Sequence, residues 1–135
     1  MMDLMRNTAC SPGDTVRAVL RFRWEREFEA VMVEFHRTTF GGAAYGNRIV
    51  LLERSREYTI EDGRPCVVAS LEGIVPDSVR PGTYVCRYVR CFVPGRGWLI
   101  LFENVGGVSL LVRRGPPVVR PGEEGAEFLA LEVGV

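Results

Sequence analysis

The segment TVRAVLRFRW alternates apolar and polar side chains over ten residues. One face carries Val16, Ala18, Leu20, Phe22 and Trp24, and the other carries Thr15 and the arginines. A period of two residues is that of a β-strand with one buried face, so we expect a half-buried strand here. Such a strand has to be covered by another sheet or by the far wall of a barrel.

Further short apolar segments follow about every ten to twelve residues, separated by Pro and Gly. They read FEAVMVEF, IVLLERSREYTI, PCVVASLEGIV, TYVCRYVRCFV, WLILF and VSLLVRR. We expect the first of them to bury Val31, Val33 and Phe35, with EREFE before it as a charged hairpin turn. The pieces EDG, PGRG and ENVGG are expected to be turns as well. Since no helical pattern of ten or more residues intervenes, an all-β sandwich or barrel is predicted.

The domain organisation follows from the length of 135 residues, which suits one domain spanning residues 1–135. We place its core at about residues 12–114. Residues 115–135 read as an extra edge strand or a linker, because Pro116 and Pro117 confine neighbouring residues to a sheet edge. If the chain is a fragment, a following domain would begin there.

Acidic and basic side chains balance at 17 each, and every basic residue is Arg. Without a net positive field, binding of nucleic acid is not expected. No apolar run is long enough to span a membrane, and the first residues lack the apolar core of a signal peptide. These features predict a cytoplasmic protein without membrane insertion, or an extracellular piece whose targeting segment was removed.

The potential catalytic and metal-binding residues are few. Cys10, Cys66, Cys86 and Cys91 form no CxxC pair, and His36 is the only histidine. We therefore expect free buried thiols, no metal, no cofactor and no catalytic site. Two alternatives stay open: a disulfide such as Cys66 with Cys86 if the protein is secreted, and a thiol-dependent enzyme with His36 beside a cysteine.

The segment VRPGTYVC places Tyr84 two residues before Cys86, directly after a Pro-Gly turn. This pattern resembles strand F of immunoglobulin-like β-sandwiches, in which the tyrosine hydroxyl bonds back to the preceding corner. The resemblance implies an antiparallel sandwich with Tyr84, Cys86 and Tyr88 facing inward. The opening strand has no cysteine and the second has no tryptophan, so we do not expect the antibody type, and the chain is similar to bacterial Ig-like modules. A jelly-roll sandwich stays open, because alternation does not determine strand order.

A narrower resemblance is to the sugar-binding C-terminal domains of polysaccharide ABC exporter ATPases, which are themselves Ig-like sandwiches. The matching pieces are PGDTVRAVLRF, VMVEFHRTTFGGAAYGN and RPGTYVC. This resemblance implies carbohydrate binding.

The longest segment without a period is HRTTFGGAAYGN, which we expect to be a surface loop. It lacks the Gly-Lys-Ser/Thr ending of a phosphate-binding loop. It contributes Phe40, Tyr45 and Asn47, followed by Arg48, and Trp98 is a candidate exposed aromatic. Aromatic and amide groups together suit a polar, flat-faced ligand.

The sequence thus predicts a non-catalytic Ig-like binding or protein-interaction module of unknown ligand, with carbohydrate binding as the alternative; the partner is a protein or a glycan. A homo-oligomer formed through an exposed edge strand is a further possibility. The candidate edges are Val118–Val119 and the C-terminal FLALEV.

Overall fold

A computed structural model describes residues 8–24, 26–38, 47–112 and 126–134. Its strands are β1 (Thr8–Cys10), β2 (Thr15–Arg23), β3 (Ala30–Arg37), β4 (Arg48–Glu61), β5 (Arg64–Ile74), β6 (Gly82–Val93), β7 (Gly97–Val112) and β8 (Ala126–Gly134). These residues contain no helix, so the prediction of an all-β protein is confirmed. The candidate edge at Val118–Val119 lies outside the described residues.

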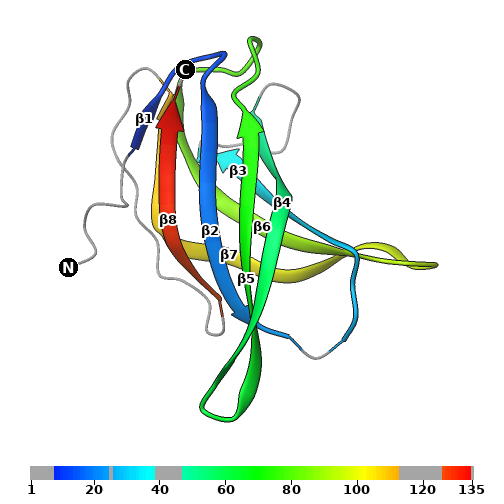
Figure 1. The fold of residues 1–135 in the computed structure, drawn as a ribbon. Coiled ribbons are helices and arrows are strands. Elements are labelled where there is room, and N and C mark those ends of the chain that lie inside the picture. Colours follow the sequence, from blue (N-terminus) through cyan, green and yellow to red (C-terminus); the bar gives the residue numbers. More distant parts are fainter. Residues whose placement is uncertain (1–7, 25, 39–46, 113–125, 135) are drawn as a thin grey trace.

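All eight strands belong to one mixed sheet in the order β1-β7-β6-β3-β4-β5-β2-β8. The pairing of β1 with β7 is parallel and the other pairings are antiparallel. The sheet curls until β1 and β8, its two ends, lie near each other, which makes a nearly closed barrel (Figure 1). The C-terminal edge strand predicted within residues 115–135 is β8, and it pairs with β2.

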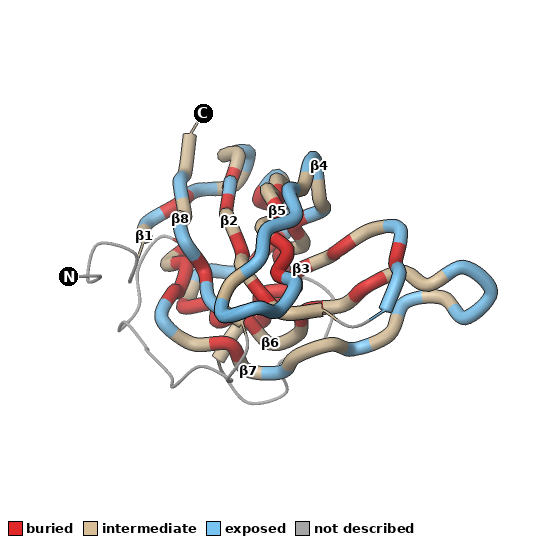
Figure 2. The backbone as a smooth tube through the Cα atoms, turned by 60° about the horizontal axis from the view of Figure 1, so that its bottom comes forward, coloured by how far each residue is buried: buried red, intermediate tan, exposed pale blue. Residues whose placement is uncertain are grey.

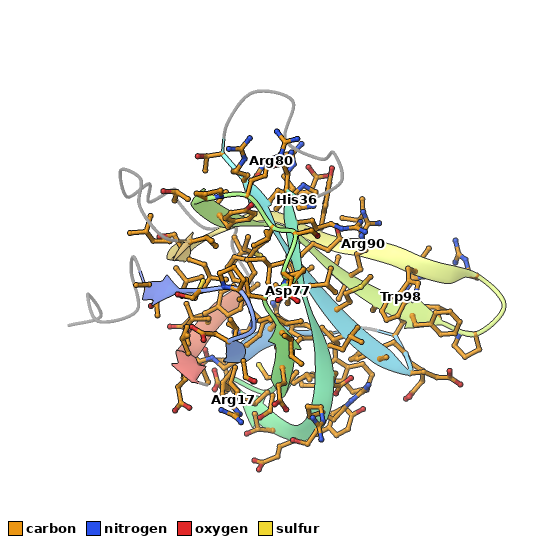
Figure 3. All side chains as sticks on the ribbon, turned by 90° about the horizontal axis from the view of Figure 1, so that it is seen from above. Arg17, His36, Asp77, Arg80, Arg90 and Trp98 are labelled. Atoms are coloured by element: carbon orange, nitrogen blue, oxygen red, sulfur yellow. The ribbon has the colours of Figure 1, made fainter. Side chains whose placement is uncertain are left out.

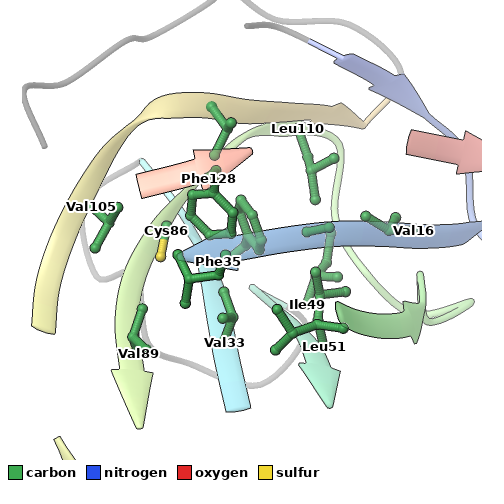
Figure 4. Packing of buried hydrophobic residues seen from close by; sticks show 14 of the residues in the cluster. Val16, Val33, Phe35, Ile49, Leu51, Cys86, Val89, Val105, Leu110 and Phe128 are labelled. Carbon is green, nitrogen blue, oxygen red and sulfur yellow. The ribbon is translucent and has the colours of Figure 1, made fainter. Parts of the chain in front are cut away.

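The core fills the inside of this barrel. As predicted, Val31, Val33 and Phe35 are buried, and β2 buries its alternate apolar residues up to Phe22. Side chains from opposite walls meet inside: the rings of Phe35 on β3 and Phe128 on β8 lie 6.2 Å apart, as Figure 4 shows. Figure 2 shows buried positions along the strands and exposed residues at the hairpin ends.

Two predicted turns are wrong. The segment EREFE does not close a hairpin, because β2 pairs with β5 and β8 whereas β3 pairs with β4 and β6. The segment ENVGG is an irregularity inside β7, where Asn104 and Gly107 have φ angles of 55° and 90°. The turns EDG and PGRG do connect consecutive strands, as predicted.

Candidate functional site

The predicted binding residues do not all gather in one place. Phe40 and Tyr45 lie outside the described residues. Asn47 is buried, and its Oδ1 accepts a hydrogen bond from Arg37 Nε at 2.8 Å. Its backbone carbonyl accepts another from the Arg37 amide at 3.0 Å. Asn47 therefore ties the end of β3 to the start of β4.

Arg48 and Trp98 lie at opposite ends of the sheet surface formed by β4, β3, β6 and β7. Arg48 pairs with His36 near the end of β3, whereas Trp98 pairs with Phe92, which pairs with Ala30 at the start of β3. Six residues of a strand span about 20 Å. Figure 3 shows His36 and Trp98 well apart, with Arg90 between them. One small ligand therefore does not reach both Arg48 and Trp98.

Tyr88 faces away from the core, so the prediction that it points inward is wrong. The cause is a β-bulge: Cys86 pairs with Phe35 and Tyr88 with Glu34, which leaves Arg87 without a partner on β3. An extra residue in one strand reverses the side of the sheet on which the following side chains lie. Tyr84 and Cys86, before the bulge, are buried as predicted.

Glu34 is buried on this outward side of β3, with an exposed fraction of 4%. Its Oε2 accepts a hydrogen bond from Arg90 Nε at 2.8 Å, and its Oε1 lies 3.0 Å from His36 Nε2. A further guanidinium, that of Arg48, lies 3.9 Å from the same Oε1. A buried carboxylate is tolerated only when it is paired in this way.

The Tyr88 ring is the centre of these contacts. Arg90 lies over it with 4.6 Å between Cζ and the ring centroid, and Arg87 lies at 5.2 Å. The His36 ring meets it edge-on at 5.5 Å. Glu34 orients the Arg90 guanidinium from below, so the cation and the aromatic ring are held in place before any ligand arrives.

Apolar side chains flank this cluster on the same side of the sheet. Residues paired directly in antiparallel strands share a side, and Leu52, Met32, Arg90 and Ile100 are paired in one row across four strands. Leu52 is 50% exposed and Ile100 46%. We call this surface of β4, β3, β6 and β7 the outer face.

Trp98 extends the outer face at its far end. The ring is 39% exposed and contacts the Phe92 ring edge-on at 5.4 Å. Trp98 is thus the one predicted binding residue that the structure shows as an exposed aromatic.

Nothing in the sequence pairs Glu34 with Arg90, because the two residues are 56 positions apart. The signal that was present is the alternation of β3, where Glu34 and His36 are polar between buried apolar neighbours. That pattern places both side chains on the outward side of the sheet. It does not show that residues of β6 bury them.

The four cysteines are free and buried, as predicted. Burial raises the pKa of Cys86 to about 12 and that of Cys10 to about 11. Both thiols are therefore protonated near neutral pH, the form that is a poor nucleophile.

Among the described residues, no three His, Cys, Asp or Glu side chains lie close enough together to hold a metal ion. The described part of the chain also has no helix that could span a membrane. No protein-family model, curated protein or solved structure matches the chain.

Proposed function

We propose that this protein is a non-catalytic binding module that recognises another protein through the outer face. The observation that carries the proposal is the set of exposed apolar side chains around the Arg90–Tyr88 pair. Tryptophan, tyrosine and arginine are the residues that most often dominate the energy of protein interfaces. The outer face presents all three, in Trp98, Tyr88 and Arg90, next to two exposed aliphatic side chains.

The charges on this surface favour a partner with acidic groups. Three guanidinium groups, those of Arg48, Arg87 and Arg90, lie around Tyr88 and Glu34. They outnumber the exposed carboxylate of Glu103, which pairs with Tyr88 on the same side of the sheet. Glu34 is buried beneath Arg90, so a partner meets the guanidinium rather than the carboxylate. We therefore infer that the partner segment carries a carboxylate for Arg90 and an apolar side chain for the Trp98–Ile100 end.

A library of random peptides displayed on phage, selected against the folded protein, tests this proposal. We expect enriched sequences that combine acidic and large apolar residues. The double variant Trp98→Ala/Ile100→Ala should weaken their binding at least about tenfold, since an interface anchor contributes more than about 1–2 kcal/mol.

Ile60→Ala is the matched control, because Ile60 is 73% exposed near the end of the β4–β5 hairpin and outside the outer face. Its peptide binding should equal that of the unaltered protein. Peptides that bind the double variant and the unaltered protein equally well would contradict the proposal. So would selection without enrichment.

The carbohydrate alternative shares Trp98 with this proposal, since an exposed indole ring also stacks on sugars. Two of its other predicted residues lie in the described ranges, and neither is near Trp98: Asn47 is buried and Arg48 lies at the opposite end of the outer face. A glycan array separates the two readings. Saturable glycan binding that Trp98→Ala abolishes would favour the sugar.

The Ig-like assignment belongs to the same proposal. In its support, the hydroxyl of the buried Tyr84 donates a hydrogen bond to the Arg80 carbonyl at 2.6 Å, which is the tyrosine-corner contact of such domains. Against it stands the single continuous order of the eight strands, because an Ig-like or jelly-roll sandwich divides its strands between two sheets. An experimental structure would decide between these architectures.

A further inference from the structure

A cavity of about 320 Å³ is lined by residues from the end of β2 and from the connection that leads to β3. Its walls come from β2, from the connection that follows, and from β6 and β7. Neither β6 nor β7 is a sheet neighbour of β2. The cavity therefore lies between opposite walls of the barrel and opens to solvent, on the inner side of the strands whose outward side forms the outer face.

The inner part of the cavity is apolar and rigid. The ring of Phe22 lies 6.1 Å from that of Phe28 and 6.0 Å from that of Phe102. Phe22 and Phe28 are almost fully buried. Arg56 fixes the Phe28 wall, because its guanidinium lies 4.1 Å above the ring and donates a hydrogen bond to the Phe28 carbonyl at 3.2 Å. A preformed aromatic wall of this kind suits a small apolar ligand.

One polar atom beside the cavity lacks a partner. Trp24 lines it, and its Nε1 is buried without a hydrogen-bond acceptor among the described residues. The indole ring packs against the rings of Phe28, at 6.3 Å, and Tyr58, at 5.3 Å. Buried N–H groups are almost always satisfied, and an exception destabilises a fold by about 1–3 kcal/mol. An acceptor from a bound molecule would remove this penalty.

Positive charge stands at the rim. Arg23 and Arg26 both line the cavity. Arg23 is engaged, with Nη1 donating to the Glu61 carbonyl at 3.3 Å and Nη2 lying 3.6 Å from Asp62 Oδ2. Within the described ranges Arg26 makes no ion pair. Its positive charge acts on Cys91 in the cavity wall, because it opposes the rise that burial causes in the pKa of that thiol. The rim therefore favours an anion over a neutral acceptor.

We propose that this cavity binds a small organic carboxylate with an aromatic or short aliphatic body. Trp24 Nε1 is covered by its neighbours in the free protein, so the ligand turns the indole ring until one carboxylate oxygen accepts the Nε1 hydrogen bond within the field of Arg26. The body packs against Phe22, Phe28 and Phe102. A volume of 320 Å³ is at the lower limit for small-molecule sites, so the ligand is smaller than a typical drug.

The test follows the Trp24 indole N–H directly by NMR of the ¹⁵N-labelled protein. The chain has two tryptophans, and Trp98→Phe identifies which indole signal belongs to Trp24. Phenylacetate, 3-phenylpropionate, indole-3-acetate and octanoate are the probes. We expect at least one to shift the Trp24 N–H signal downfield in a saturable way, as a new hydrogen bond requires. The matched carboxamide should bind at least about tenfold more weakly, because a hydrogen bond to a charged acceptor is the stronger one.

Two variants test the roles of the named groups. Trp24→Phe keeps an aromatic ring but removes the donor, and it should lower affinity by about 10- to 100-fold. Arg26→Gln should weaken the carboxylate several-fold and leave the carboxamide unchanged. Arg96→Gln, at an exposed arginine in the β6–β7 turn, is the control and should change neither.

Three results would overturn the proposal. The first is an indole signal of Trp24 that no probe moves, and the second is a Trp24→Phe variant that binds as tightly as the unaltered protein. The third is an N–H that already has a permanent acceptor such as a trapped water. If Trp24→Phe fails to fold, the proposal is still tested by the shift of the Trp24 N–H signal in the unaltered protein and by the effect of Arg26→Gln on carboxylate binding. The outer face does not enter these measurements, so failure here leaves the proposed protein interaction standing.

Discussion

The buried thiol of Cys86 makes folding stability depend on alkaline pH. In the folded protein burial raises the pKa of Cys86 from 9.0 to about 12. In the unfolded chain the same thiol ionises near its ordinary pKa. Between pH 9 and 12 the unfolded state therefore loses a proton that the folded state keeps. This favours unfolding, so the stability linked to Cys86 is complete below pH 9 and is lost as the pH rises toward 12.

The size of the effect follows from the pKa shift. Each pH unit above 9 removes about 1.4 kcal/mol of folding free energy, so a rise from pH 8 to 10.5 removes about 2 kcal/mol through Cys86. The ionisation of Cys10 and Tyr84, whose pKa values burial also raises, adds to the loss. A comparison with Cys86→Ala cancels these other groups, because they are present in both proteins.

Urea unfolding at pH 8.0, 9.5 and 10.5 measures this difference. At pH 8.0 Cys86→Ala should be the less stable protein, since it leaves a small cavity, and by pH 10.5 the gap should have closed by about 2 kcal/mol. Val89→Ala is the matched control, because Val89 occupies the next buried position of β6 and does not titrate. Its deficit should be the same at every pH. A gap for Cys86→Ala that is equally constant would refute the reasoning, since the native thiol would then ionise as it does in the unfolded chain.

Three further predictions concern other parts of the barrel. Gly73→Ala should destabilise the protein by about 3 kcal/mol or more in urea unfolding, because the new Cβ would lie 2.1 Å from the Val50 carbonyl oxygen. Gly134→Ala should stay within about 0.5 kcal/mol of the unaltered protein, because its new Cβ would meet the Arg17 guanidinium at an ordinary contact distance of 3.8 Å. Tyr84→Phe should cost about 1–3 kcal/mol in the same assay, since the Arg80 carbonyl loses the phenolic donor. Iodoacetamide should label the cysteines of the native protein slowly and uniformly, whereas rapid reaction of a single cysteine would favour the thiol-dependent enzyme.

The sequence predicted those features that depend on neighbours along the chain. The inward faces of β2 and β3 follow from alternation within a single segment, and both predictions hold for Phe22, Val33 and Phe35. The turn at EDG also depends on a few consecutive residues, and Asp62 and Gly63 adopt the positive φ angles of 53° and 74° that a tight hairpin needs. All the residues that determine such features lie within about ten positions of one another in the sequence.

Strand order depends instead on contacts that no local pattern contains. EREFE has the composition of a hairpin turn, yet β2 and β3 lie on different walls because closing the barrel places β5 and β8 beside β2. The Trp24 indole and the Phe102 ring line one cavity for the same reason, although 78 positions separate them. The cavity was therefore beyond prediction, whereas the apolar character of its walls was visible in the sequence.

The composition of the outer face depends on one extra residue, Arg87, at the β-bulge in β6. The β6 side chains in the hydrophobic core are Tyr84, Cys86, Val89 and Cys91, so the step is three at the bulge and two elsewhere. A strand without this bulge would place Tyr88 in the core and Val89 in water. With it, Tyr88 pairs with Glu34 and lies beneath the Arg90 guanidinium. The register of β6 against β3 thus determines which side chains lie on the outer face, where a partner can contact them.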